Sequence, residues 1–212
     1  MKKIVLILCC VLMTGYCIGQ IMSDKKNAAS NLSKPLIALL DTIFKEDQGD
    51  RLNIDTIRKQ FGWQSKQMDS LMNIMGYHDS MNLMRVKHII DMHGWPGPDV
   101  VGEKGASTIF LVVQHADSLT QVTYLPKMQE AVKEGKAKPQ QLALLEDRVL
   151  TNQGKPQIYG SQVRRNEQTG KNEFYPIIDE PNVNKRRASV GLEPLEDYAK
   201  KYFGIDYNVL KL

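Results

Sequence analysis

His115 is the best candidate in this chain for acid–base chemistry, because the unperturbed pKa of histidine lies nearest to neutrality among the side chains. The apolar run of residues 109–113 leads into Gln114 and His115, and Asp117 follows two positions later. Residues two apart on a helix do not face each other, so the spacing predicts no ready-made pair of His115 and Asp117. The structural alternative is a histidine that caps a helix C-terminus, where positive charge is favourable.

Polar residues also lie on the apolar stripes of two earlier helical segments. Asp47 and Arg51 continue one stripe, and Asp79 and Asn82 lie on the other. Buried carboxylates, amides and guanidinium groups are costly unless paired or used, so this pattern predicts a polar pocket inside a helical bundle. A buried Asp79 needs a partner, which Arg51 or Arg148 could provide. The structural alternatives are a surface ion pair of Asp47 with Arg51 and an asparagine that fixes helix register.

Gln157, Tyr159 and Gln162 form a third polar group, near the C-terminal end. Amide and phenol groups on a strand suit hydrogen bonding to a polar ligand such as a sugar, and they equally suit bonding between a hairpin and helices. The predicted catalytic residues are His115, Asp117 and Asp79, and the predicted ligand-binding residues are Asp47, Arg51, Asn82, Trp95, Gln114, Arg148, Gln157, Tyr159 and Gln162.

Motifs for metal, serine and phosphate chemistry are missing from the sequence. His93, Glu103 and His115 could form a two-histidine, one-carboxylate set, but no spacing requires it, and we predict no metal and no cofactor. The chain has no G-x-S-x-G motif and no phosphate-binding glycine loop. A pair of carboxylates of the glycosidase kind stays open. Its candidates are Asp47, Asp79, Glu103, Asp117 and Asp147.

Residues 1–19 predict a secretory signal peptide. A basic start is followed by an apolar stretch at residues 4–13, which is too short for a comfortable membrane span, and by a small-residue cleavage site at residues 17–19. Lipid attachment at Cys17 is the alternative, which the bulky Tyr16 disfavours. We therefore expect export to the periplasm or the extracellular space, with no stable transmembrane segment after cleavage.

The mature chain has no cysteine, because all three cysteines lie within the first seventeen residues. This excludes a disulfide, a thiol nucleophile and a thiolate metal site. Removing Lys2 and Lys3 from the 28 basic residues leaves 26, against 24 acidic residues. That near balance argues against a nucleic-acid partner. The expected partner is a small polar ligand or an envelope protein.

The apolar periodicity predicts a single, mainly α-helical domain at residues 33–212, with orthogonally packed helices, after a flexible tether at residues 20–32. Ser33 should cap the first helix, with Pro35 in its first turn. We expect this helix to loosen at Gly49 or Asp50 and a second one to follow. The second is predicted at Asn53 to Phe61, and a third from about Ser65 to Met92, with a potential interruption at Gly76.

The glycines and prolines of residues 94–98 must end that third helix. The next apolar run also suits a strand, but its helical spacing favours a helix. Pro126 should lie in the first turn of the following helix, which Gly135 ends. The remaining predicted elements are a helix from about Leu142 to Gly154, a β-hairpin of residues 157–165 and 171–178, and two short helices opened by Asn182 and Pro194.

Several of these segments together resemble a widespread bacterial domain-of-unknown-function family, and the resemblance covers most of residues 36–200. It implies that the QHAD-like, DR-like and YG(S/T)Q-like segments belong to one shared core, with Ser161 in place of the usual threonine. The residue before Gly-Trp-Pro is not a fixed histidine in that family, which argues against His93 as a ligand. The segments that carry the resemblance are Asp47-Gln48 with Arg51, Asp79 with Asn82, Gly94-Trp95-Pro96, residues 102–106, Gln114-His115-Ala116-Asp117, Leu145-Glu146-Asp147-Arg148-Val149 and residues 157–162.

The resemblance implies no activity, so the functional expectation rests on the polar residues. If the protein is an enzyme, we expect a hydrolase that acts on a polar envelope-derived substrate. His115 or a carboxylate would be the general base, and Arg51 or Arg148 would stabilise negative charge. The alternative is a non-catalytic ligand- or partner-binding module, whose buried polar residues form a structural network.

Overall fold

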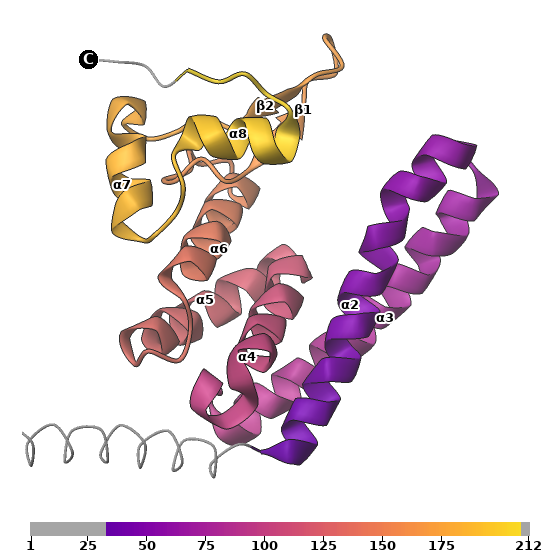
Figure 1. Ribbon diagram of the computed structural model, residues 1–212, viewed down its shortest axis with the longest axis vertical. Coiled ribbons are helices and arrows are strands. Elements are labelled where there is room, and N and C mark those ends of the chain that lie inside the picture. Colours follow the sequence, from indigo (N-terminus) through magenta and orange to yellow (C-terminus); the bar gives the residue numbers. More distant parts are fainter. Residues whose placement is uncertain (1–32, 209–212) are drawn as a thin grey trace, which may run out of the picture.

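The computed structural model describes residues 33–208, which form seven α-helices, one short 3-10 helix and a two-stranded hairpin (Figure 1). The prediction of a mainly α-helical fold with a C-terminal hairpin is confirmed. The predicted signal peptide and tether lie outside the described residues. Among the helices of residues 33–208, none is both long and apolar enough to cross a membrane.

Helices α2 (Lys34–Phe61) and α3 (Lys66–His93) form a long antiparallel pair (Figure 1). Ser33 occupies the N-cap position of α2, although its side chain makes no capping bond. The hydroxyl of Ser65 does cap α3, because it accepts a hydrogen bond from the backbone N–H of Met68 at 3.2 Å. Gly94 ends α3 with a positive φ of 68°.

The predicted break near Gly49 is wrong, since α2 runs unbroken and includes the segment predicted as a separate helix. Gly76 does not interrupt α3 either. A glycine inside a helix costs about 1 kcal/mol relative to alanine. Side-chain bonds join α2 to α3 on both sides of Gly49, with Arg85 bonded to Glu46 at 2.7 Å and Arg51 to Asp79 at 2.9 Å.

Helix α4 (Pro98–His115) packs against α2 and confirms the helical interpretation of the apolar run. A kink at Gly102, which has a positive φ of 71°, separates the first turn of α4 from the rest of the helix. The core lies where α4 meets α2 and α3, and it includes the side chain of Trp95, which is 5% exposed. The fully buried residues of this core include Leu40, Ile43, Val86, Ile89, Val101, Ile109 and Val113.

Helices α5 (Ser118–Lys133) and α6 (Pro139–Asn152) pack against each other beside α4. The predicted start of α5 at Pro126 is wrong, because this proline lies inside the helix. The helix begins earlier because the Asp117 carboxylate caps it. That carboxylate accepts hydrogen bonds from the Thr120 backbone N–H at 2.9 Å and the Thr120 hydroxyl at 2.7 Å.

The C-terminal part contains strands β1 (Val163–Arg165) and β2 (Asn172–Phe174), which pair antiparallel and are shorter than predicted. The 3-10 helix η1 (Glu180–Asn182) leads into α7 (Val183–Ser189), and α8 (Leu195–Phe203) follows. Figure 1 shows this part stacked on the end of α6. Both short helices begin where the sequence predicts, after Asn182 and after Pro194.

Asp147 of α6 attaches this C-terminal part to the helices. Its fully buried carboxylate accepts backbone N–H bonds from Ile158 at 2.7 Å, Tyr159 at 3.0 Å and Ser161 at 2.9 Å. Burial raises the pKa of Asp147, although these three donors favour the charged form. The carboxylate is thus a structural anchor for residues 158–161.

Gly105 on α4 is closely packed against α2 and Gly76 on α3 faces open space, so substitutions at the two glycines should have opposite effects. A methyl group on Gly105 would lie 2.9 Å from Cβ of Val101 and 3.1 Å from Cδ1 of Leu40, so Gly105→Ala should destabilise the fold by about 1–3 kcal/mol. Gly76 has no atom within 4 Å of such a methyl group, so Gly76→Ala should stabilise it by about 0.4–1 kcal/mol. Urea unfolding of the two variants measures both signs. Equal effects would contradict the close approach of the two helices.

Candidate functional site

The buried carboxylate of Asp47 holds the imidazole of His115. Asp47 lies on α2 and is 1% exposed, and its two oxygens lie 3.0 and 3.1 Å from Nδ1 of His115 at the end of α4. An ionised carboxylate can only accept hydrogen bonds, so Nδ1 is the donor. In neutral His115 the proton therefore sits on Nδ1, and Nε2, which has no protein partner among residues 33–208, is free to accept another.

The surroundings of Asp47 keep its carboxylate charged despite burial. Burial by itself raises the pKa, but the hydrogen bond and charge of His115, the amide of Gln48 at 2.6 Å and the charge of Arg51 outweigh it, so the pKa is lowered. Arg51 approaches Asp47 at 3.3 Å. The carboxylate of Asp47 is therefore negative at neutral pH.

Arg51 continues this network to α3, where both oxygens of Asp79 accept from its Nη2 at 3.0 and 2.9 Å. Asp79 thus reaches His115 through Arg51 and Asp47 and makes no direct contact with it. It belongs to the network behind the histidine. This geometry supports a role for Asp79 in positioning Arg51.

His115 forms part of the wall of a pocket of about 320 Å³. The pocket lies among α4, α6, the segment before β1, and α8. Two polar atoms of its wall are buried without a hydrogen-bond partner in the described structure, Oε1 of Gln114 and Nε of Arg148. The lining residues are Phe110, Leu111, Gln114, His115, Leu144, Arg148, Ser161, Gln162, Val163, Tyr198 and Phe203.

Arg148 has no carboxylate partner within residues 33–208, unlike Arg51. Burial lowers its pKa, and so does the charge of Arg51, while Tyr198 acts in the opposite direction. A guanidinium nevertheless keeps its proton in proteins. The pocket therefore combines an imidazole with a free proton-accepting nitrogen and an uncompensated positive charge.

The structure places three of the predicted site residues away from the pocket wall. Asp117 is exposed and caps α5. Trp95 is buried in the apolar core. Gln157 is fully buried, where its amide donates to the carbonyls of Gln162 and Tyr175 at 3.0 and 2.9 Å.

Asn82 and Tyr159 also lie away from the pocket wall. Asn82 is fully buried on α3 and accepts from Arg85 at 3.2 Å, which fits the alternative that it fixes the pairing of α2 with α3. The backbone N–H of Tyr159 bonds to Asp147, and its carbonyl accepts from Arg187 at 2.7 Å. Gln162 does line the pocket, with its amide bonded to Ser161 at 2.9 Å.

Sequence reasoning missed the contribution of α8 to the site. Tyr198 and Phe203 close one side of the pocket, and the Tyr198 hydroxyl donates to the Ser161 carbonyl at 3.3 Å. The periodicity of this short helix shows which residues face inward. It carries no signal for what they face, so this part of the pocket could not be found from the pattern.

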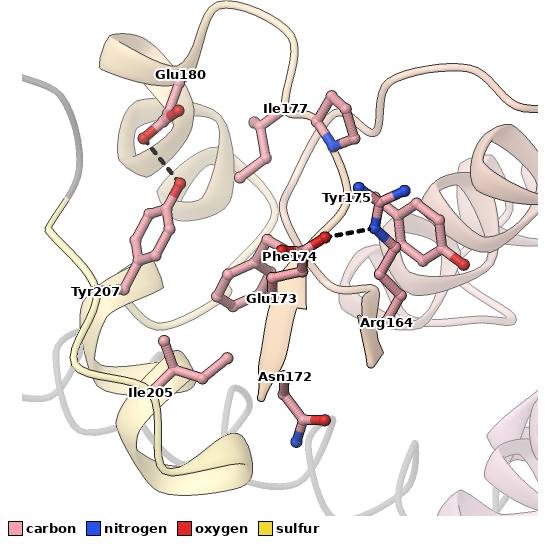
Figure 2. Close-up of a pocket in the computed structure, with 10 residues that line it drawn as sticks. Arg164, Asn172, Glu173, Phe174, Tyr175, Ile177, Glu180, Ile205 and Tyr207 are labelled. Atoms are coloured by element: carbon pink, nitrogen blue, oxygen red, sulfur yellow. Dashed lines mark hydrogen bonds and ion pairs between the residues drawn. The ribbon is translucent and has the colours of Figure 1, made fainter. Parts of the chain in front are cut away.

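A second cavity, of about 400 Å³, lies between strand β2 and the segment after α8 and shares no lining residue with the first (Figure 2). Its charged groups pair with neighbours, since Arg164 bonds to Glu173 at 2.7 Å and the Tyr207 hydroxyl to Glu180 at 2.8 Å. Its wall contains no histidine. Acid–base chemistry is therefore better supported at His115.

The potential metal set of His93, Glu103 and His115 does not come together. Glu103 pairs with Lys138 at 2.8 Å, and His115 binds Asp47. Within residues 33–208, no cluster of three or more histidine, cysteine, aspartate or glutamate side chains could hold a metal ion.

Comparisons with known proteins give one match. A family model described as "Family of unknown function (DUF6624)" matches residues 37–209. No curated protein and no solved structure matches the chain.

Replacing Asp47 should change stability in a pH-dependent way. Folding lowers the pKa of Asp47, so its stabilisation is complete above the ordinary value of 3.8 and is lost as the pH falls through the lower folded value. We expect Asp47→Asn to cost about 1–3 kcal/mol at neutral pH and progressively less below about pH 4. Urea unfolding at neutral pH and at about pH 3 measures this difference.

The matched control is Asp55→Asn, because Asp55 forms an exposed pair with Arg58 and such pairs contribute little. Its effect on the free energy of unfolding should be small at every pH. A cost for Asp47→Asn that stays constant down to pH 3 would contradict a charged, stabilising carboxylate.

Proposed function

This chain belongs to DUF6624, a family of unknown function, and we propose that it is a hydrolase in which His115, held by Asp47, acts as the general base. The observation that carries the proposal is the buried Asp47 carboxylate on Nδ1 of a histidine whose ring lines a pocket beside Arg148. The predicted signal peptide supports a polar substrate from the cell envelope.

In the proposed reaction, Nε2 of His115 takes a proton from a water molecule in the pocket while the water oxygen attacks the scissile centre. The negative charge of Asp47 stabilises the imidazolium that forms. The imidazolium then gives the proton to the leaving group as the scissile bond breaks. His115 returns to its neutral form, so the protons balance over one turnover.

Arg148 is the side chain in the pocket wall that best stabilises negative charge on the substrate. Its charge is not neutralised by a carboxylate of the described structure, and it is half-buried, where charge interactions are stronger than in water. Arg51 is less suited to this role, because Asp79 and Asp47 already occupy it.

The second candidate function is a non-catalytic binding module with a structural polar network. The observation that favours it is the pairing of Asp47, which bonds to His115, Gln48 and Arg51 and so needs no substrate to be satisfied. In this case His115 and Asp47 matter for stability alone. The unpartnered atoms of Gln114 and Arg148 favour an occupied pocket in either case.

An activity panel with matched histidine variants tests the hydrolase. We expect the wild-type protein to hydrolyse at least one class among chromogenic esters, anilides, phosphates and glycosides. His115→Ala should lower kcat/KM by about 10²- to 10⁴-fold, and Asp47→Asn should lower kcat with little change in KM, because both remove general-base catalysis. The variants are compared at equal folded concentration.

His88→Ala is the control, because His88 is an exposed histidine on α3 away from the pocket. It should keep wild-type kcat/KM. Wild-type hydrolysis that survives in His115→Ala would overturn the proposal. No hydrolysis on any substrate class, together with a lower melting temperature of His115→Ala, would establish the structural network instead.

A further inference from the structure

The unpartnered groups of the pocket point to the chemistry of its ligand. We propose that the pocket binds an acyl amino acid with an apolar side chain, either free or as the C-terminal residue of a peptide, through its carboxylate. This deepens the proposed function, because it names the substrate class of the same pocket. The pocket presents a cation, a hydrogen-bond acceptor and an apolar wall to a ligand.

The cation is Arg148, whose Nε is buried and unpartnered in residues 33–208. The nearby arginines differ from it. Arg51 is held by two carboxylates. Arg187 also keeps a buried Nη2 without a partner, but it does not line the pocket, and its other nitrogens donate to the carbonyls of Glu193 and Tyr159 at 2.6 and 2.7 Å. A buried donor without an acceptor is costly, and the planar guanidinium fits a carboxylate with two parallel bonds. Arg148 is therefore the binding group for an anion.

The charges of the site favour an anion with one negative charge. Arg148 is the single cation of the pocket wall without a carboxylate partner in the described structure, so it neutralises one charge. The Asp47 carboxylate lies directly behind His115 and repels any further negative charge. A carboxylate meets this condition, whereas a phosphate monoester carries nearly two charges at neutral pH.

The acceptor is Oε1 of Gln114, a residue that is 6% exposed and lines the same pocket. A buried carbonyl oxygen without a donor calls for an N–H or O–H group on the ligand. An ammonium group is disfavoured, because Arg148 would repel it. The neutral amide N–H of an acyl amino acid lies next to its carboxylate, so one residue supplies both groups.

The remaining wall is apolar and comes from several elements. At about 320 Å³ the pocket is at the small end of ligand sites, which suits about one residue rather than a long chain. An aliphatic side chain of the ligand would be removed from water there. The apolar lining residues are Phe110, Leu111, Leu144, Val163 and Phe203.

Isothermal titration calorimetry with defined probes tests the proposal. N-acetylleucine carries all three groups, N-acetylleucine amide lacks the carboxylate, and 4-methylpentanoate lacks the amide. We expect N-acetylleucine to bind the full chain at least about tenfold more tightly than either of the others, because each lacks one partner of a buried group. The dipeptide N-acetylalanylleucine separates the two sources, since it binds more tightly than N-acetylleucine if the pocket takes a peptide end.

Arginine variants assign the binding to Arg148. Arg148→Gln should weaken N-acetylleucine binding by about tenfold or more while leaving the affinity for the amide probe unchanged. The affinity of Arg148→Lys for N-acetylleucine should lie between those of Arg148→Gln and the wild type. Arg58→Gln, an exposed arginine on α2, is the matched control and should bind like the wild type. Thermal unfolding of each variant confirms that it is folded.

Several results would overturn the inference. One is that N-acetylleucine does not bind at concentrations up to about 10 mM, and another is that N-acetylleucine amide binds as tightly as N-acetylleucine. The others are that Arg148→Gln binds N-acetylleucine as tightly as the wild type does, and that inorganic phosphate binds more tightly than N-acetylleucine. N-acetylleucine belongs to the proposed substrate class, so binding is also measured with the folded His115→Ala variant, which lacks the proposed general base. Failure to bind is then distinct from failure of the proposed hydrolase. Binding of N-acetylleucine to a protein that hydrolyses nothing would keep the ligand class and overturn the reaction.

Discussion

The charge of one buried carboxylate, that of Asp47, constrains the arrangement of the first three helices. An ionised carboxylate inside a protein is stable only where hydrogen bonds and opposite charges replace the water it loses. Asp47 finds them on α4, through His115, and on its own helix, through Gln48 and Arg51. Arg51 in turn binds Asp79 on α3. The same bonds that satisfy the carboxylate thus fix α2, α3 and α4 relative to one another.

Two pairs of buried polar residues in this protein have different consequences. Asp147 and Gln157 have their polar atoms satisfied by the backbone of the C-terminal part, so their burial is complete and closed to solvent. Gln114 and Arg148 keep buried atoms without a partner in the described structure, and both line one pocket. Adjacent residues on α6 therefore have opposite roles, with Asp147 joining the two parts of the fold and Arg148 facing the pocket.

The residues that line the pocket come from elements spread over residues 110–203. His115 and Gln114 come from α4, Arg148 from α6, and Tyr198 from α8, and the Asp147 anchor holds the intervening segment in place. A histidine supported by a carboxylate beside a free guanidinium is a combination that general-base chemistry uses. Asp47 holds the imidazole in place before any ligand binds, whereas the Nε of Arg148 has no partner in the described structure and is left for a ligand.

The sequence by itself determined the helical class, most helix ends and the burial of Asp47, because these follow from periodicity, caps and the cost of an unpaired charge. It also named most of the pocket's polar residues. It did not determine their partners. Asp117 is two positions from His115 and caps α5, whereas the true partner, Asp47, is 68 positions away. Only the tertiary structure decided that pairing, and the contribution of α8, because contacts between distant helices depend on how their faces meet and leave no local pattern in the chain.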